Sequence, residues 1–205
     1  MRQTGAMVEK LTRERRRELT REALIDAATE VFAERGFEGA SLDEIAAAAG
    51  FTRGAIYANF DGKEDLYYAV NDRFNQRALT VFADVADRGD VEPRDMAAVA
   101  DTWWPLMSRD RKVRVLGAEF SAYAARHPEL RARSAAHREK TVAMIADYIA
   151  AHRLPEEAQY DPRLLAKVFM AVSDGVEASA DLDPEAPRIL ETIFTLLLAG
   201  IDATS

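Results

Sequence analysis

Several polar side chains that suit recognition of a nucleic acid lie in the segment GFTRGAIYANFDGKEDL, residues 50–66: Thr52, Arg53, Tyr57, Asn59 and Lys63. An arginine forms paired hydrogen bonds to a guanine edge or a phosphate, and hydroxyl, amide and ammonium groups donate to phosphate oxygens. Thr52 stands at the expected start of a helix, where its hydroxyl and the free backbone N–H groups would favour a phosphate. Gly54 lacks a side chain and would permit a close approach. The segment therefore has the chemistry of a DNA-binding surface.

Helical signals surround this segment. Apolar residues repeat at helical spacing from about Thr20 and stop at Gly36. Ser41 and Glu44 have the spacing of a capping box, and the helix that they begin should end at Gly50. A second and third helix joined by a tight glycine turn match the helix-turn-helix pattern. We expect the first four helices over about 20–36, 41–50, 52–60 and 61–89.

The rest of the chain also has helical periodicity, and we find no alternating β-branched run that predicts a strand. Asp161 followed by Pro162 is typical of a helix start, and the His127–Pro128 pair should break a helix. The fold class is therefore all-α, with about nine helices. The later helices are expected at about 93–107, 110–126, 129–153, 162–180 and 187–199.

The charge is unevenly distributed along the chain, which has a net charge of −8. Residues 1–21 carry seven Lys or Arg and three Glu, a local charge of +4, whereas the residues after Lys63 include 17 basic and 24 acidic ones, a local charge of −7. Because binding to a polyanion depends on local basic side chains, the acidic total does not exclude DNA. The basic residues Arg13, Arg15, Arg16 and Arg17 would contact the DNA backbone or minor groove, or would form a solvated disordered tail.

Other functional classes find little support. The chain has no cysteine, no apolar signal segment near its first residues, and no aliphatic run longer than that around 192–201, so we expect a cytoplasmic protein and no membrane partner. Its three histidines do not stand beside a nucleophile motif, and a P-loop, GxGxxG or HExxH is absent. We therefore expect no enzyme, no cofactor and no metal, although the sequence leaves catalysis by carboxylates open.

The segment from Thr20 to Val70 resembles the N-terminal domain of the TetR family of transcriptional repressors throughout its length. It contains the pattern AxxG-[VF]-[ST]-x-G-x-[IL]-Y-x-x-F-x-x-K-[ED]-x-L. The resemblance implies an all-helical dimer in which a small DNA-binding domain is joined through the fourth helix to a larger domain. The implied division is a flexible basic segment (1–19), a helix-turn-helix domain (20–65) and a domain for effector binding and dimerisation (66–205).

The resemblance also assigns roles by position. Arg53 would read a base edge, with Thr52 as a second candidate, and Gly54 would give clearance. Ile56 and Phe60 would be core residues. Family members commonly have histidine at position 59, so the asparagine there departs from the pattern. Phosphate contact is assigned to Ser41, Tyr57, Asn59 and Lys63. The full set of residues implied in DNA contact is Ser41, Thr52, Arg53, Gly54, Tyr57, Asn59 and Lys63.

Large aromatic and sulfur-containing side chains in the second half of the chain would line an effector pocket or pack in an ordinary core. Glu119 and Tyr123 are four residues apart on one helical face, an arrangement that suits a cation. The implied effector is therefore a small apolar or cationic molecule. The candidates are Trp103, Trp104, Met107, Glu119, Phe120, Tyr123, Met144, Tyr148, Phe169 and Met170.

The last two helices would form the dimer interface that the resemblance implies, as a two-fold arrangement of four helices. Burial of the same side chains within one subunit is the alternative. Small and apolar residues would allow close approach on the earlier helix, and an apolar stripe would follow the later one. The candidates are Ala171, Val172, Gly175, Val176 and Ser179, followed by Ile189, Ile193, Leu196 and Leu197.

These patterns predict a ligand-responsive DNA-binding regulator, a repressor released from a near-palindromic operator by a small-molecule effector. A dimeric DNA-binding regulator without an effector is the first alternative. A helical small-molecule-binding protein or an enzyme is the second.

Overall fold

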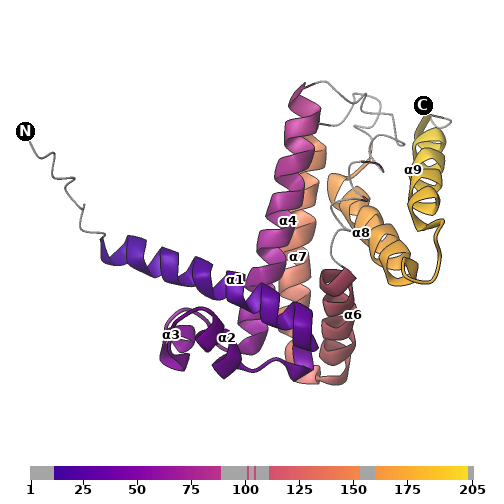
Figure 1. Ribbon diagram of the computed structural model, residues 1–205. Helices are drawn as coiled ribbons and strands as arrows, with labels where there is room; N and C mark the ends of the chain where they lie inside the picture. The colour runs from indigo at the N-terminus through magenta and orange to yellow at the C-terminus, as the bar shows by residue number, and fades with distance from the viewer. Residues whose placement is uncertain (1–11, 89–100, 102–103, 105–110, 153–159, 203–205) are drawn as a thin grey trace, which may run out of the picture. The chain divides into compact units, whose positions relative to one another are not determined.

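The computed structural model describes residues 12–88, 101, 104, 111–152 and 160–202. In these ranges the chain forms eight α-helices and one short 3-10 helix and no strand, so the predicted all-α class is confirmed (Figure 1). The chain divides into two compact units, residues 1–70 and residues 71–205, which we call the first and the second unit. The boundary between them falls within α4 (Lys63–Arg88).

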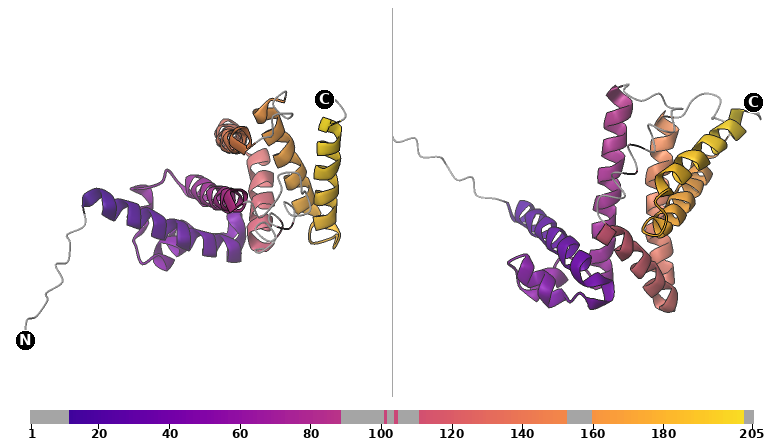
Figure 2. Two further views of the ribbon diagram at one scale, coloured as in Figure 1. Left: turned by 90° about the horizontal axis from the view of Figure 1, so that it is seen from above. Right: turned by 45° about the vertical axis from the view of Figure 1, so that its right-hand side comes forward.

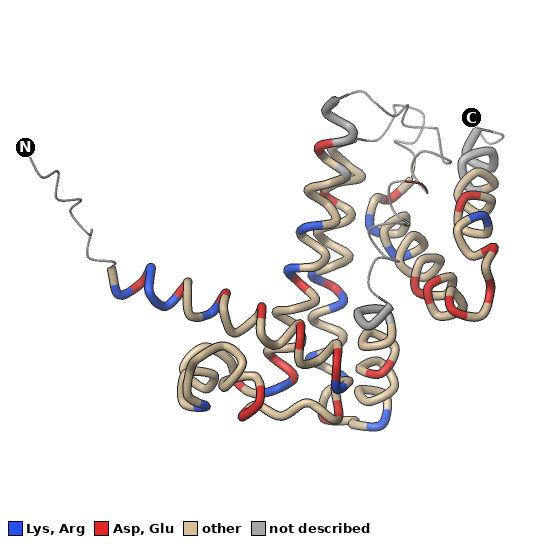
Figure 3. Tube along the Cα trace, viewed as in Figure 1, with Lys and Arg blue, Asp and Glu red and all other residues tan. Residues whose placement is uncertain are grey.

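The first helix, α1 (Arg13–Gly39), begins earlier than the predicted start at Thr20. The side-chain oxygen of Thr12 accepts a hydrogen bond of 3.1 Å from the backbone N–H of Arg15, which caps the helix. The predicted flexible segment extended to residue 19, whereas the structure places residues 13–19 in α1. Figure 3 shows Lys and Arg positions on these first turns of α1. At the predicted stop, Gly36 has a φ of 71° and interrupts the helical geometry.

The second and third helices are short, and a glycine turn joins them. The capping box that starts α2 (Leu42–Ala48) is confirmed, because the Ser41 hydroxyl accepts from the backbone N–H of Glu44 and the Glu44 carboxylate accepts from the backbone N–H of Ser41. Gly50 has a φ of 74°, which a residue with a side chain rarely adopts, and it closes the turn before α3 (Arg53–Tyr57).

The third helix ends at Tyr57, before the predicted end at Phe60. The side-chain Nδ2 of Asn59 donates to the carbonyl oxygen of Ala55 at 2.8 Å. That carbonyl would accept the backbone N–H of Asn59 in a continuing α-helix, and this N–H donates instead to Ile56, at 2.9 Å. At the end of α3 the side chain of Asn59 thus replaces its own backbone N–H at the carbonyl oxygen of Ala55.

The first unit packs around aromatic rings. The ring centroid of Phe37 lies 5.7 Å from that of Phe32 and 5.7 Å from that of Tyr67, in tilted and edge-on arrangements. Apolar side chains from α1 to α4 complete this core with exposures of 3% or less: Leu24, Ala28, Ile45, Ala46, Ile56, Phe60 and Leu66. Burial of Ile56 and Phe60, as predicted, holds α3 by its inner face.

The second unit contains the rest of α4 and the helices that follow it. The predicted start at Asp161 is confirmed, because its carboxylate accepts from the backbone N–H of Arg163 at 2.9 Å, and the predicted break at His127–Pro128 is also confirmed. Most of the helix expected at 93–107 lies outside the described residues. The helices are α6 (Arg111–Arg126), the 3-10 helix η1 (Pro128–Leu130), α7 (Arg131–His152), α8 (Pro162–Ser179) and α9 (Ala186–Asp202).

Two separate apolar clusters stabilise the second unit. One joins α8 and α9, which lie side by side in Figure 2, and contains Phe169 stacked on Phe194 with ring centroids 5.4 Å apart. The other joins α7 and α8 through Val142, Ala146 and Ala166. Among the helices that the structure describes, none combines the length and the apolar character needed to cross a membrane.

Candidate nucleic-acid interface

Arg53 is the basic residue of α3 and has two partners. Its Nη1 donates to the Oδ2 of Asp43 on α2 at 2.9 Å, and its Nη2 donates to the hydroxyl oxygen of Tyr57 at 3.1 Å. Its side chain nevertheless remains 53% exposed. The hydrogen bond to Tyr57, followed by the charge of Asp43, raises the pKa of Arg53, so the guanidinium is permanently charged.

Thr52 and Tyr57 extend the exposed side of the same helix. Tyr57 is 54% exposed, and Thr52 is also exposed. Thr52 occupies the N-cap position as predicted, but its hydroxyl makes no capping hydrogen bond. A Cβ on Gly54 would lie 3.6 Å from the hydroxyl oxygen of Thr52, an ordinary contact, so the absence of a side chain is not required by packing inside the unit.

Ser41 does not present the free hydroxyl that phosphate contact requires. The hydroxyl accepts from the backbone N–H of Glu44 at 3.2 Å and donates to the Glu44 Oε2 at 2.9 Å. These bonds from Ser41 lower the pKa of Glu44, so the carboxylate beside Ser41 is charged at neutral pH. The Ser41 hydroxyl therefore caps α2 in this structure, and its predicted phosphate contact stays a prediction.

Lys63 is directed into the first unit. Its Nζ donates to the carbonyl oxygens of Phe37, Glu38 and Ala40 at 2.8, 3.2 and 3.0 Å, and it lies 4.7 Å from the centroid of the Phe37 ring. An ammonium has three N–H donors, so these carbonyls use all of them. Burial lowers the pKa of Lys63. In this structure Lys63 ties the end of α1 to the start of α4, and its predicted phosphate contact stays a prediction.

Asn59 also serves the fold. One side-chain N–H is donated to Ala55, and the Oδ1 is buried without a hydrogen-bond partner. The carbonyl oxygen of Asn59 accepts from the Nη1 of Arg21 at 3.0 Å, and the Arg21 guanidinium lies 4.3 Å from the centroid of the Phe60 ring. The predicted phosphate contact of Asn59 does not match this arrangement, because the side chain that would make it closes the end of α3.

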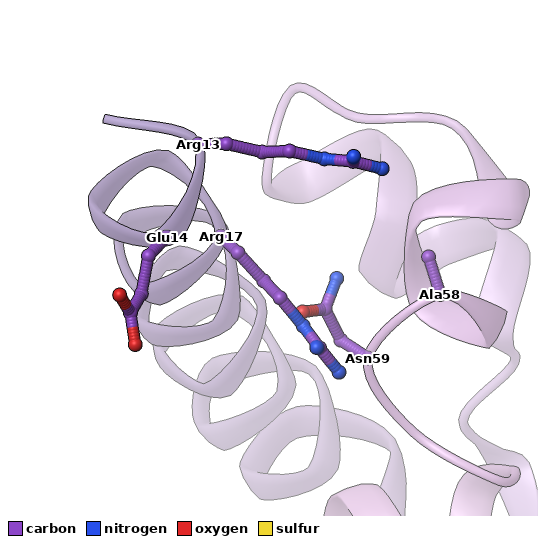
Figure 4. A pocket seen from close by; sticks show the side chains of 5 residues that line it. All are labelled: Arg13, Glu14, Arg17, Ala58 and Asn59. Atoms are coloured by element: carbon purple, nitrogen blue, oxygen red, sulfur yellow. The ribbon is translucent and has the colours of Figure 1, made fainter. Parts of the chain in front are cut away.

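A groove of about 580 Å³ lies between the first turns of α1 and the end of α3. It is lined by Arg13, Glu14, Arg17, Ala58 and Asn59 (Figure 4). Figure 4 shows the side chains of Arg13 and Arg17 extending toward the end of α3, whereas that of Glu14 points away. Folding of residues 12–19 into α1 thus gives two guanidinium groups a defined place beside the predicted reading helix.

The sequence did not identify Asp43 or Arg21 as partners of this surface. Asp43 lies ten residues before Arg53, and only the glycine turn brings the two side chains together. Arg21 lies 38 residues before Asn59. Neither spacing belongs to a helical period, so no local pattern could have found these contacts.

The effector-pocket candidates are distributed over separate parts of the second unit. Trp104 and Phe169 pack against the cluster between α8 and α9, and Met170 packs against the cluster between α7 and α8. Phe120 is buried, its ring 6.2 Å from that of Tyr123. Glu119 is exposed, and Met144, Tyr148 and Tyr123 are half-buried. Trp103 and Met107 lie outside the described residues.

One face of the Tyr123 ring is covered by a histidine. Its ring centroid lies 4.0 Å from that of His127, whose Nδ1 is 3.0 Å from the Oε1 of Glu129. The suggested cation site of Glu119 and Tyr123 is therefore already shared with a histidine that carries a charge when it is protonated.

Three of the nine dimer candidates are exposed, four are half-buried and one is buried. Val176 is only 6% exposed and packs within the subunit beside Leu190, so its predicted place in the interface is wrong. Val172, Ile189 and Ile193 are half-buried against the same cluster, and Ser179 is half-buried with its hydroxyl donating to Val176. The side chain of Leu197 is not among those that the structure describes. The exposed members are Ala171, Gly175 and Leu196, the last with an exposure of 67%.

The geometry of the first unit is that of a helix-turn-helix protein, in which a short helix after a tight turn carries exposed polar groups on a rigid core. The described residues include no group of three His, Asp or Glu side chains that could hold a metal. Residues 24–70 match the family model for bacterial regulatory proteins of the tetR family, and residues 122–202 match the MftR C-terminal domain. The chain belongs to the TetR family of transcriptional regulators.

Individual relatives agree with this assignment over limited lengths. The chain is 53% identical over 53 residues to the HTH-type transcriptional regulator SrpR of Pseudomonas putida. The matched stretch is 26% of this chain and 25% of SrpR. The chain is also 50% identical over 66 residues to the transcriptional repressor BepR of Brucella suis. This matched stretch is 31% of this chain and 32% of BepR. The match therefore spans less than a third of either protein.

Solved structures match over nearly the whole chain. A TetR-family transcriptional regulator from Rhodococcus sp. has a TM-score of 0.68 at 19% identity, covering 90% of this chain and 98% of that one. The multidrug binding protein EbrR, solved with imidazole, has a TM-score of 0.66 at 25% identity, covering 92% and 97%. The relatives are transcriptional regulators, which are not enzymes.

Proposed function

We propose that the chain is a DNA-binding transcriptional regulator whose α3 enters the major groove. One observation carries the proposal: Arg53 and Tyr57 are more than half exposed on a helix whose opposite side, through Ile56, is completely buried. A rigid helix with exposed donors is what base recognition requires, because the donors must keep their geometry while they contact the duplex.

Arg53 is the proposed base reader, and Thr52 and Tyr57 supply hydroxyl groups around it. Among the accessible side chains, Tyr57 and the basic groove of Arg13 and Arg17 are proposed to contact phosphates. The side chains of Ser41, Asn59 and Lys63 are engaged within the first unit and are not part of this proposal. Each phosphate contact by a basic side chain adds to the salt dependence of binding. Gly54 remains in its predicted role of allowing a close approach.

The active form is proposed to be a homodimer that binds a near-palindromic operator. Support comes from the second unit, where Leu196 is 67% exposed on α9 and Leu164 is 56% exposed on α8. Single exposed leucines are common, but the small Ala171 and Gly175 are also exposed and would let a second copy approach closely.

Sedimentation velocity of the full chain tests the dimer. Leu196→Glu should raise the concentration at which the dimer dissociates by at least tenfold, because a charge would replace an apolar contact. Ala150→Glu, which places the same side chain at an exposed position of α7, is the control. Equal dimerisation of both variants would contradict the proposed interface.

Repression relieved by a small effector is the proposed mode of regulation. BepR is named a repressor, and EbrR is named a multidrug binding protein; each supports this mode only as a relative. In the proposed mechanism a ligand in the second unit shifts α4 and changes the separation of the two α3 helices in the dimer. A small apolar or cationic ligand and a role without catalysis belong to the same proposal.

Gel-shift binding to the DNA upstream of its own gene or of a neighbouring gene tests the proposed activity. Arg53→Ala should weaken binding by about 5- to 150-fold, the usual value of a good bidentate base contact. Asp147→Ala, an exposed change on α7, should leave binding unchanged. A folded dimer that binds none of these DNAs at low salt would contradict the proposal. A thermal-shift screen of apolar and cationic compounds then tests for an effector.

A further inference from the structure

The pairing of Asp43 with Arg53 is an unusual feature for a surface that meets DNA. The Asp43 carboxylate lies on α2 with 67% of its side chain exposed, and its Oδ2 is 2.9 Å from the Arg53 Nη1. Tyr57 accepts a second hydrogen bond from the Nη2 of the same guanidinium at 3.1 Å. A negative charge here would repel phosphates, so general affinity for DNA does not explain it.

Stability does not explain the pair either. Both side chains are about half exposed or more, and an ion pair in that environment contributes little to the free energy of unfolding, because water and salt screen it. What the pair does change is the freedom of Arg53. A guanidinium bonded at one nitrogen by a carboxylate on α2 and at the other by a hydroxyl on α3 has its plane fixed relative to both helices.

The fixed guanidinium keeps enough donors to read a base. Arginine has five N–H groups, and the two hydrogen bonds use two of them. A guanine presents two acceptors, O6 and N7, at its major-groove edge, and they require two adjacent donors in one plane. An unanchored arginine could turn instead to the nearest phosphate, where its contact would carry no sequence information.

We propose that Asp43 is a positioning residue that holds Arg53 for a guanine edge, raising sequence discrimination while lowering affinity for DNA in general. This inference rests on the proposed function of α3 as the reading helix. Asp43 itself does not contact the base. It acts by favouring the arginine orientation that serves a base edge over those that would serve a phosphate, and by ordering the side chain before binding.

The test measures discrimination and general affinity separately. Duplexes selected by the full-length protein from a library with a randomised central region provide the specific probe, and a scrambled duplex of the same length and composition provides the general probe. Dissociation constants for both are measured for the unchanged protein, Asp43→Ala and Asp43→Asn. Glu34→Gln removes an exposed acid from α1 of the same unit and is the control for charge.

Asp43→Ala should bind the scrambled duplex more tightly and should lose up to about fivefold of the ratio between the two probes, the most that an exposed ion pair of this kind contributes. The lost discrimination should fall on the same base pair that Arg53→Ala relaxes. Asp43→Asn keeps an acceptor oxygen without the charge, so it should also bind the scrambled duplex more tightly while retaining more of the ratio. Glu34→Gln should leave the ratio unchanged.

A double-mutant cycle distinguishes positioning from a simple charge effect. In the Arg53→Ala background, Asp43→Ala should no longer change the ratio, because there is no guanidinium left to orient. If Asp43→Ala alone leaves the ratio unchanged, or lowers it equally with and without Arg53, the positioning role is overturned while the proposed function stands. If the unchanged protein, folded and dimeric, does not distinguish the selected from the scrambled duplex, both are overturned.

Discussion

The two units of this chain differ in how their side chains pack and in which hydrogen-bond partners they have. In the first unit one aromatic core lies beneath the surface, and polar residues such as Arg53 and Lys63 have defined partners, in the case of Lys63 three carbonyl oxygens. In the second unit, two clusters of described apolar residues are separate, and three of the large side chains expected around an effector are divided between them: Trp104 and Phe169 pack against one, and Met170 packs against the other.

The similarities to other proteins differ in identity with the length that is matched. Identity reaches 53% over 53 residues shared with SrpR, whereas structures that match nearly the whole chain are 19% and 25% identical. A unit that must present a few groups to a duplex of constant geometry has little room for variation. A helical unit can keep its fold with many different apolar side chains, provided that volume and pattern are maintained.

The largest effect is expected when the ring at the centre of the first unit's core is removed, which tests the difference between the cores of the two units. Phe37 is completely buried, so Phe37→Ala should cost about 3–5 kcal/mol of the free energy of unfolding and should abolish DNA binding. Phe194→Ala, in the second unit, is the matched change. Calorimetry of both variants measures the cost and shows whether one transition or two are affected.

If Phe37→Ala does not fold, Phe37→Leu can be measured in its place. It retains much of the buried volume and should lose less stability than Phe37→Ala. An unchanged transition temperature in both Phe37 variants would contradict the single-core description of the first unit.

The next effect concerns Lys63. Lys63→Met should lower the free energy of unfolding by about 1–3 kcal/mol, because the carbonyls of Phe37, Glu38 and Ala40 lose their shared donor. Chemical denaturation measures this cost. Lys140→Met, at an exposed lysine of α7, should have little effect.

The salt dependence of DNA binding distinguishes this structural role from phosphate contact. If Lys63 only supports the fold, Lys63→Met will leave the slope of log affinity against log salt unchanged. A slope reduced by about 0.9 would indicate one lost phosphate contact and would restore the role that the sequence predicted.

A smaller effect is expected at the capping box of α2. Ser41→Ala should cost about 1 kcal/mol, because the backbone N–H of Glu44 loses its acceptor. Thermal unfolding measures the loss, and Ser41→Thr should restore most of it. DNA binding measured well below the unfolding temperature should change little if Ser41 only caps the helix, and a large loss would support phosphate contact instead.

The smallest effect is a pH dependence confined to the second unit. Burial lowers the pKa of His137 below its ordinary value of 6.5, while the charge of Asp72 opposes this shift and that of Lys140 adds to it. The unfolded chain therefore takes up the proton first as the pH falls. Stability from neutral His137 is fully present above about pH 6.5 and is lost as the pH falls toward the lowered pKa.

The variant His137→Gln should flatten this part of the stability profile while keeping a donor for Asn71, whose Oδ1 lies 3.0 Å from the His137 Nε2. Urea unfolding at several pH values between 7 and 5 measures the profile. An equally steep loss of stability in the variant would show that other groups cause it.

The sequence by itself determined those features that depend on residues close together in the chain. Helical periodicity predicted the all-α class, the spacing of Ser41 and Glu44 predicted the start of α2, and Asp161–Pro162 predicted the start of α8. Similarity to the family identified α3 as the candidate reading helix. Capping and turn signals act over a few residues, so a short segment contains all the information that they need.

Only the tertiary structure decided what each polar side chain does. Whether Lys63 meets a phosphate depends on three carbonyls more than twenty residues earlier in the chain, and the orientation of Arg53 depends on a carboxylate on another helix. Val176 fits a dimer stripe by spacing but is buried beside Leu190. A side chain's role depends on which partners folding brings within hydrogen-bond or packing distance, and residue type and spacing do not contain that information.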